Sequence, residues 1–173
     1  KFGPDGKLYI TTGDATDKEL AQDMNSLGGK ILRMNSDGSV PTDNPFPNSY
    51  IYTLGHRNPQ GIAWQPVTNQ LFETEHGPSV FYGPAGGDEV NIVKAGQNFG
   101  WPIVHHKQHK DGLIDPLLEF TPAVAPSGAM FYTGDVFPQL KNNFLFAVLK
   151  GQGIMRVEFS ADDPSKVTRT TQL

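Results

Sequence analysis

The sequence predicts an all-β protein that consists of about three four-stranded blades of a β-propeller. Short β-type runs are separated by turns that are rich in the chain's 19 glycines and 14 prolines, which is typical of turn-rich all-β proteins. A pair of strands with similar sequence also recurs along the chain, as repeated blades require.

The first half of the chain is predicted to form strands, with one short helix among them. The run Lys7–Thr12 follows a Pro-Asp-Gly turn and alternates apolar with polar residues, as a half-buried strand does. Between Glu19 and Gly29, apolar residues at helical spacing precede a glycine pair, so we expect a short helix there. Further strands are expected at Lys30–Met34, Tyr50–Leu54, Gly61–Gln65, Gln70–Thr74 and Glu89–Lys94.

The repeat consists of an apolar strand that ends near a glycine and is followed by a second strand. The first strands are KLYITTGD (7–14), QLFETEHG (70–77) and NFLFAVLKG (143–151), and the second are KILRMNS (30–36), DEVNIVK (88–94) and IMRVEFS (154–160). Blades with long inserted loops give this pattern, whereas a β-sandwich gives evenly spaced strands without internal likeness. Three blades would leave two sheet faces bare, so we interpret residues 1–173 as a partial propeller domain with both ends of the full domain missing.

Composition and charge narrow the classes of partner. The net charge of −4 is spread without long blocks, which argues against a nucleic-acid surface and a polybasic membrane patch. No apolar run reaches the roughly 20 residues of a bilayer span, and the opening KFGPDGKLYI lacks the layout of a signal peptide. The absence of cysteine excludes disulfides, thiolate catalysis and cysteine-bound zinc. We therefore expect a small molecule or another protein as the partner.

Candidate site residues begin with the loop in GHRNPQGIAW. Arg57 and Asn58 stand just before a predicted strand, which in a propeller places them at the mouth of the channel. Arg57 suits an anion-binding role, because a guanidinium can fork onto carboxylates or a developing oxyanion. A structural arginine that ties loops together explains its position equally well.

The next strand ends in Glu75-His76-Gly77-Pro78. His76 is either a ligand or a surface histidine. Gly77 lets the backbone approach a ligand closely, and the carbonyl of Pro78 is a hard oxygen donor suited to calcium. The carboxylates of Asp88 and Glu89 either support a cation or cap a turn.

Two further groups of residues complete the candidate set. Asp14, His76 and Lys150 occupy matching places in the three repeats, so we expect them at one rim of the blades. Ser127 in APSGAMFY lies just before another predicted strand. The histidines of IVHHKQHKD, which are His105, His106 and His109, suggest zinc, but the segment lacks complementary ligands and we expect a solvated loop without a metal.

Taken in order, these motifs resemble those of the soluble glucose/sorbosone and aldose sugar dehydrogenases that depend on pyrroloquinoline quinone (PQQ). The matching segments are FGPDGKLYITTGD (2–14), AQDMNSLGGKILRMNSDGSVPTDNPF (21–46), YTLGHRNPQGIAW (52–64), EHGP (75–78), GGDEVNIVKAGQNFGWP (86–102), APSGAMFY (125–132) and LKG (149–151). The order of GHRNPQG, EHGP and NFGWP is specific, and the resemblance spans nearly the whole chain.

The resemblance implies a six-bladed propeller that oxidises an aldose at its anomeric carbon to the lactone and passes a hydride to PQQ. In the matching positions, Arg57 would stabilise the charge that develops on the quinone oxygen. The cofactor and its carboxylates would be held by Asn58, His76, Ser127 and Lys150. His76 stands where glucose-type members carry a glutamine, which places the chain nearer the branch with broad aldose specificity.

The resemblance also implies a metal and a positioned base. The backbone oxygens of Gly77 and Pro78 would bind calcium, which acts as a Lewis acid on the quinone. Asp14 would match the aspartate that orients the catalytic histidine and raises its basicity. That histidine is expected a few residues before FGPDG, and a pair of cofactor-binding arginines is expected after the last blade. We therefore expect these 173 residues to hold one side of the site without the base and to be inactive alone.

The family resemblance further implies an external electron acceptor and a periplasmic or secreted location. Half-propellers are also expected to self-associate through their bare sheet faces. Two alternatives stay open. One is a non-catalytic propeller fragment that serves as a binding module, and the other is a calcium-dependent propeller hydrolase of the lactonase type.

Overall fold

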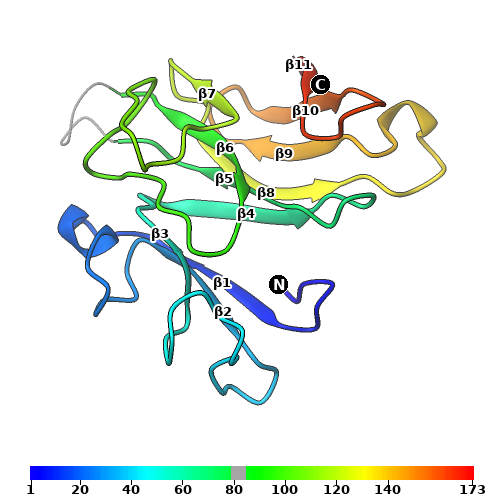
Figure 1. Ribbon diagram of the computed structural model, residues 1–173. Coiled ribbons are helices and arrows are strands. Elements are labelled where there is room, and N and C mark those ends of the chain that lie inside the picture. Colours follow the sequence, from blue (N-terminus) through cyan, green and yellow to red (C-terminus); the bar gives the residue numbers. More distant parts are fainter. Residues whose placement is uncertain (79–84) are drawn as a thin grey trace.

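The computed structural model describes residues 1–78 and 85–173, which form three antiparallel sheets (Figure 1). The first sheet has the strands β1 (Leu8–Thr12), β2 (Lys30–Met34) and β3 (Ile51–Leu54). The second has β4 (Pro59–Trp64), β5 (Leu71–Glu75), β6 (Asp88–Val93) and β7 (Leu118–Phe120), and the third has β8 (Pro126–Phe131), β9 (Phe144–Val148), β10 (Gly153–Phe159) and β11 (Val167–Gln172). Strands that follow one another within a sheet are paired neighbours. The predicted blades are confirmed, although the first sheet has three strands rather than four.

The three repeated strand pairs are antiparallel neighbours in the structure. They are β1 with β2, β5 with β6, and β9 with β10, as the sequence repeat predicts. Two strands were not predicted, β7 and β11. The sequence of β11, VTRTTQ, has only one apolar residue and gives no apolar alternation. Ser127, expected just before a strand, lies inside β8.

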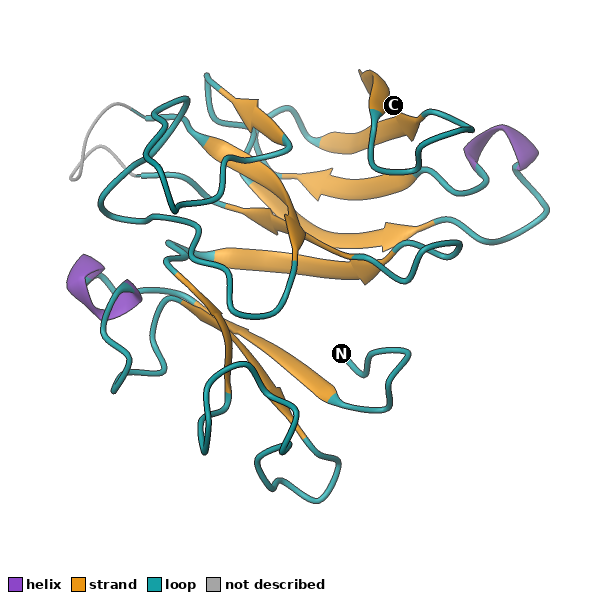
Figure 2. Cartoon of the chain, in the orientation of Figure 1, coloured by secondary structure: helices purple, strands orange, loops and turns teal. Residues whose placement is uncertain are grey.

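The helix predicted between Glu19 and Gly29 is wrong. The segment contains part of a 3-10 helix, Lys18–Ala21, and the other helical element of the described residues is the 3-10 helix Pro138–Leu140 (Figure 2). Met24 and Leu27 are 41% and 50% exposed, so their helical spacing does not mark a buried face. None of the helices in the described ranges is long and apolar enough to cross a membrane.

Lys30 explains why this segment takes an irregular path. Its side chain is fully buried, and its ammonium group donates hydrogen bonds to the carbonyls of Leu20 (2.6 Å), Ala21 (3.1 Å) and Gly28 (2.7 Å). Buried carbonyl groups need a donor. The carbonyls of Leu20 and Ala21 also accept from the amides of Asp23 (3.2 Å) and Gly55 (3.0 Å), whereas that of Gly28 depends on Lys30. The loop is therefore fixed by a side chain from β2 that follows it in sequence.

The middle sheet is buried on both faces because it lies between the other two. Successive side chains of a strand point to opposite faces. Along β5, Phe72 packs into the core shared with the β8–β11 sheet, and Leu71 packs into the core shared with the β1–β3 sheet. Every residue of β5 is buried as a result. The polar residues of this strand must consequently find partners inside the protein.

Replacing Lys30 by methionine should lower the free energy of unfolding by about 1–3 kcal/mol, because the carbonyl of Gly28 loses its donor and an unsatisfied buried carbonyl costs about that much. Burial also lowers the pKa of Lys30 from 10.5 to about 8. Between these values the unfolded chain binds more protons than the folded chain, so the free energy of unfolding of the parent should rise with pH in this window. Urea denaturation at several pH values measures both effects.

Lys18→Met is the matched control, since Lys18 lies in the same segment but is exposed. It should leave both the free energy of unfolding and its pH dependence near those of the parent. Equal stability of Lys30→Met and Lys18→Met would contradict the structural role given to Lys30.

Candidate functional site

A cavity of about 270 Å³ lies at the end of the blades where β5 leaves the middle sheet. Arg57 enters its lining from the β3–β4 connection. His76, Gly77 and Pro78 line it from the end of β5, and Lys150 lines it from the end of β9. Five of the eight residues that the sequence singled out thus surround one space.

The loop that carries Arg57 is fixed by backbone hydrogen bonds to two other sheet ends. The carbonyl of Arg57 accepts from the amide of Asp14 (2.8 Å), and the carbonyl of Asn58 accepts from the amide of His76 (3.1 Å). The amide of Arg57 itself donates to the carboxylate of Glu75. The guanidinium Nε of Arg57 is buried and has no hydrogen-bond partner among the described residues. Three backbone contacts therefore hold this loop in place, while the buried Nε of Arg57 is left without a partner in the described ranges.

The three predicted residues outside the cavity lining lie close to it. Asp14 is 5% exposed, and its carboxylate accepts from the indole N–H of Trp101 (2.9 Å) and from the amide of Thr16 (3.0 Å). The side-chain oxygen of Asn58 accepts from Gln60 (2.9 Å). Ser127 is exposed on β8, and its carbonyl accepts from the hydroxyl of Thr74 (2.8 Å).

His76 and Lys150 give the cavity a basic wall. Lys150 is exposed, and its amide donates to the carbonyl of Val124 (3.1 Å). Burial lowers the pKa of His76, while the negative charge of Asp88 acts in the opposite direction. A neutral imidazole is the form that can accept a hydrogen bond or a proton.

Asp88 organises the backbone on which Gly77 lies. One of its oxygens accepts from the amide of Gly77 (2.9 Å), and the other accepts from the amides of Val124 (2.8 Å) and Ala125 (2.7 Å). Of the two roles left open for this carboxylate, the structure shows the capping of backbone amides. A Cβ atom on Gly77 would overlap the carbonyl oxygens of Gly86 and Gly87, so glycine allows several carbonyl groups to converge here.

Beneath this end of the blades lies a buried polar cluster that sequence reasoning missed. His56 is fully buried, and its two ring nitrogens lie 2.8 Å from Thr53 Oγ1 and 2.8 Å from a carboxylate oxygen of Glu75. The ring of His56 stacks on Phe99 at 4.6 Å between centroids. The only sequence signal is the alternation along β5, which puts Glu73 and Glu75 on the same face.

Glu73 is the member of the cluster whose buried carboxylate is only partly hydrogen-bonded. One oxygen accepts from the amide group of Asn91 (2.7 Å), and the other, Oε2, is buried with no hydrogen-bond partner in the described ranges. Ligand atoms of His56, Glu73 and Glu75 lie within 4.8 Å of one another. Burial and the neighbouring carboxylate of Glu75 raise the pKa of Glu73 well above its ordinary value, so a proton on Glu73 relieves the repulsion.

The three histidines that suggested zinc do not come together. His109 is exposed and pairs with Asp115 (2.8 Å) and Asp111 (3.3 Å). The expectation of a solvated loop holds for His109 but is wrong for His105 and His106, which are half-buried with their Nδ1 atoms 2.8 Å apart. They are more buried than His109 because the ring of His105 lies near Trp101 and that of His106 lies against Gly87.

The residues around the cavity suit a cofactor that carries carboxylates together with a hard cation. Arg57 and Lys150 supply two positive charges. Gly77 and Pro78 line the same space, and backbone carbonyl groups such as theirs are oxygen ligands of the kind that calcium takes. A set built from carbonyl oxygens, without cysteine, does not suit a soft metal.

Comparison with known proteins agrees with this geometry. The family model described as Glucose / Sorbosone dehydrogenase matches residues 1–173. The aldose sugar dehydrogenase YliI of Escherichia coli is 33% identical over 179 residues, which cover 93% of this chain and 47% of the relative. Quinoprotein glucose dehydrogenase B of Acinetobacter calcoaceticus is 41% identical over 125 residues, which cover 60% of this chain and 25% of the relative. The chain thus spans less than half the length of these curated relatives.

Solved structures give the same result. The PQQ-bound form of the aldose sugar dehydrogenase from Streptomyces coelicolor superposes with a TM-score of 0.84 at 36% identity, covering 99% of this chain and 47% of that one. A putative oxidoreductase (glucose dehydrogenase) from Thermus thermophilus superposes with a TM-score of 0.87 at 39% identity, covering 99% of this chain and 50% of that one.

Replacing Glu73 by glutamine should change how stability depends on pH. Above the ordinary pKa of 4.5, the folded parent keeps a proton that the unfolded chain loses, so the parent's free energy of unfolding should fall as pH rises through this window. Glutamine stays neutral, so the variant should be flatter with pH and more stable than the parent near pH 8 by about 1 kcal/mol.

Urea denaturation at a series of pH values from 5 to 8 measures this difference, and Glu158→Gln, on β10 of the third sheet, serves as the carboxylate control. A parent protein whose free energy of unfolding does not fall between pH 5 and 8 relative to Glu73→Gln would contradict the protonated state.

Proposed function

The chain belongs to the glucose/sorbosone dehydrogenase family, and from this premise we propose that it forms one side of the active site of a PQQ-dependent aldose sugar dehydrogenase. The observation that carries the proposal is the single cavity lined by Arg57, His76, Lys150 and the backbone of Gly77 and Pro78. It brings two cations and two carbonyl ligands to one place from three separate strand ends.

The proposed chemistry is the oxidation of an aldose at its anomeric carbon to the lactone. When bound, PQQ supplies the acceptor for the hydride that leaves this carbon, and calcium supplies the Lewis acid. In this assignment Gly77 and Pro78 hold the calcium through their carbonyl oxygens. Arg57 provides the positive charge where negative charge develops, a form of stabilisation that acts mainly in the transition state.

The remaining site residues would hold the cofactor and position the base. Lys150 and His76 would bind the cofactor from the wall of the cavity, and Asn58 and Ser127 from its edge. Asp14 would orient a histidine base contributed by another part of the enzyme, as carboxylates paired with imidazole do. Its hydrogen bonds from Trp101 and Thr16 hold the carboxylate in a fixed direction.

Two other functions predict different behaviour. A binding module would take up a ligand without turnover, and a calcium-dependent hydrolase of the lactonase type would act without quinone. Adding calcium and PQQ to an enzyme that contains this chain should produce the absorbance of bound cofactor. Adding an aldose and a dye as the external electron acceptor should then produce reduction of the dye. Lactone hydrolysis without dye reduction would contradict the dehydrogenase proposal.

Arg57→Ala should lower the turnover number by about a hundredfold or more in such an enzyme, while the apparent affinity for the sugar changes little. Arg169→Ala, at an exposed arginine on β11, is the control and should turn over like the parent. Steady-state dye reduction gives both constants. A turnover number that is the same in Arg57→Ala as in the parent would remove Arg57 from the mechanism.

The 173-residue chain by itself should not oxidise aldoses, even with calcium and PQQ in excess. A positioned base typically contributes about a hundred- to ten-thousandfold, and the family resemblance places that base and a pair of cofactor-binding arginines outside residues 1–173. His76 lies beside Gly77 and Pro78 at the cavity wall, where it is assigned to the cofactor. Quinone-dependent glucose oxidation by the purified chain would show that one of its own histidines serves as the base.

A further inference from the structure

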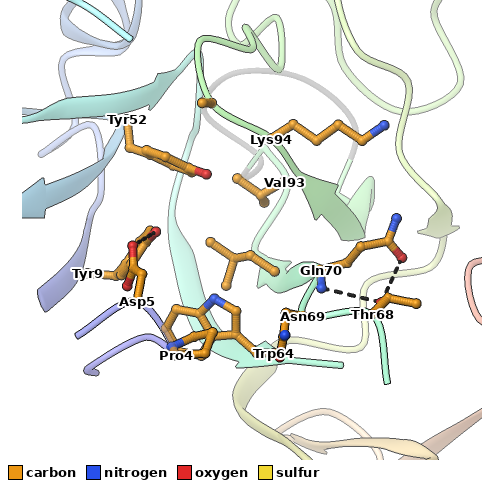
Figure 3. A pocket seen from close by; sticks show the side chains of 12 residues that line it. Pro4, Asp5, Tyr9, Tyr52, Trp64, Thr68, Asn69, Gln70, Val93 and Lys94 are labelled. Atoms are coloured by element: carbon orange, nitrogen blue, oxygen red, sulfur yellow. Dashed lines mark hydrogen bonds between the residues drawn. The ribbon is translucent and has the colours of Figure 1, made fainter. Parts of the chain in front are cut away.

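A second hollow lies at the opposite end of the blades. It is a groove of about 500 Å³ between the first and second sheets (Figure 3). Trp64 is the last residue of β4, whereas Arg57 precedes the first residue of that strand. The groove and the cavity at Arg57 therefore lie at opposite ends of β4. We call this second hollow the far groove.

The base of the far groove is apolar and is fixed by strand register. Trp64, Leu71 and Val93 are cross-strand neighbours on β4, β5 and β6, so their side chains share one face of the middle sheet. Leu71 and Val93 are both 3% exposed, while Trp64 is only half-buried. Trp64 thus contributes surface to the lining of the groove, and Figure 3 shows it among the lining side chains.

Three aromatic rings form one wall of the far groove. Tyr9 packs edge-to-face against Tyr52 at 5.2 Å and against Trp64 at 5.1 Å, so these two rings flank it. The hydroxyl of Tyr9 donates to Asp5 (3.0 Å), which fixes the central ring. Such a group presents rigid apolar surface at a low entropic cost.

The rim of the far groove carries uncommitted polar groups. In the described part of the chain, five groups of the lining have no hydrogen-bond partner: the hydroxyl of Tyr52, the indole N–H of Trp64, the side-chain amide of Asn69, Nε2 of Gln70 and Nζ of Lys94. Figure 3 shows these side chains around the hollow. Together they offer donors and acceptors on several sides of one apolar base.

The charge of the far groove argues for a neutral ligand. Arg33 donates to the carboxylate of Asp5 from two nitrogens at 2.8 and 3.0 Å and also pairs with Asp43 at 2.9 Å. These three side chains together carry one net negative charge, which the positive charge of Lys94 balances. Lys94 is then the one charged lining side chain without an ion pair among the described residues. A phosphate or nucleotide calls for several cations, and this groove does not offer them.

We propose that the far groove is a non-catalytic binding site for a neutral saccharide of one or two rings. Pyranose rings have an apolar C–H face that stacks on aromatic rings and hydroxyl groups around the edge that exchange hydrogen bonds with amides. Tyr52 and Trp64 match the first feature, and Asn69, Gln70 and Lys94 match the second. The volume falls within the range of small-molecule sites. This site needs neither quinone nor calcium, so it is independent of the proposed redox function.

Isothermal titration calorimetry of the 173-residue chain with glucose and cellobiose, without PQQ or calcium, tests the proposal. The parent should show saturable binding of at least one of the two sugars. Trp64→Ala should weaken that binding at least about tenfold, while Trp64→Phe should restore most of it. Because Trp64→Ala also removes a packing contact with Tyr9, the double variant Gln70→Ala, Lys94→Ala provides a second test at the rim. It should weaken binding about threefold or more.

Arg169→Ala, at an exposed arginine on β11 of the third sheet, is the control and should bind the sugar as the parent does. Circular dichroism should show that each variant keeps the β signal of the parent. The proposal is overturned if the parent binds neither sugar saturably. It is equally overturned if binding is unchanged in Trp64→Ala and in the rim double variant.

Discussion

The carboxylate of Glu75 is the interaction on which the candidate site depends. Its two oxygens bind the amide of Arg57 and the ring of His56, so one side chain at the end of β5 fixes the loop that precedes β4. The anchor is buried, where a hydrogen bond to a charged group is stronger than in water and an unmatched partner costs more. Arg57 is therefore presented to the cavity from a backbone that has little freedom to move.

Irregular pairing of β4 and β8, the first strands of the second and third sheets, adds to this anchoring. The register of β4 against β5 shifts between Pro59 and Gly61, and that of β8 against β9 shifts between Pro126 and Ala129. Such bulges redirect the chain and its side chains, and they are common beside active sites. Both shifts lie at the strand end that carries the cavity. The same device thus sets the direction of the loop with Arg57 and of the segment with Ser127.

The sequence predicts those strands in which apolar and polar residues alternate or whose sequence is repeated along the chain. Pairs such as β5 with β6 follow from the repeat, whereas the polar β11 is defined only by its partner β10. The helix predicted before Lys30 is wrong because backbone carbonyls of that segment accept hydrogen bonds from the buried ammonium group of Lys30, which belongs to β2. Such a contact joins separate segments and is not visible in local sequence. In the site, the shared rim followed from matching repeat positions. The cluster of His56 with Glu73 depends on register and burial, which local sequence does not encode.

The cavity and the far groove lie at opposite ends of the middle sheet, the cavity toward the third sheet and the groove toward the first, and their separation decides whether they can act on one ligand. From Leu71 to Glu75 the strand advances about 13 Å at roughly 3.3 Å per residue. Ile62, Glu73 and Asn91 fill the groove-side face of the sheet beyond Leu71, and all three are buried. A single sugar ring cannot reach from one end to the other, and the packed face leaves no path for a longer chain. A saccharide in the groove and a cofactor in the cavity would consequently bind at the same time, each to its own end of β5.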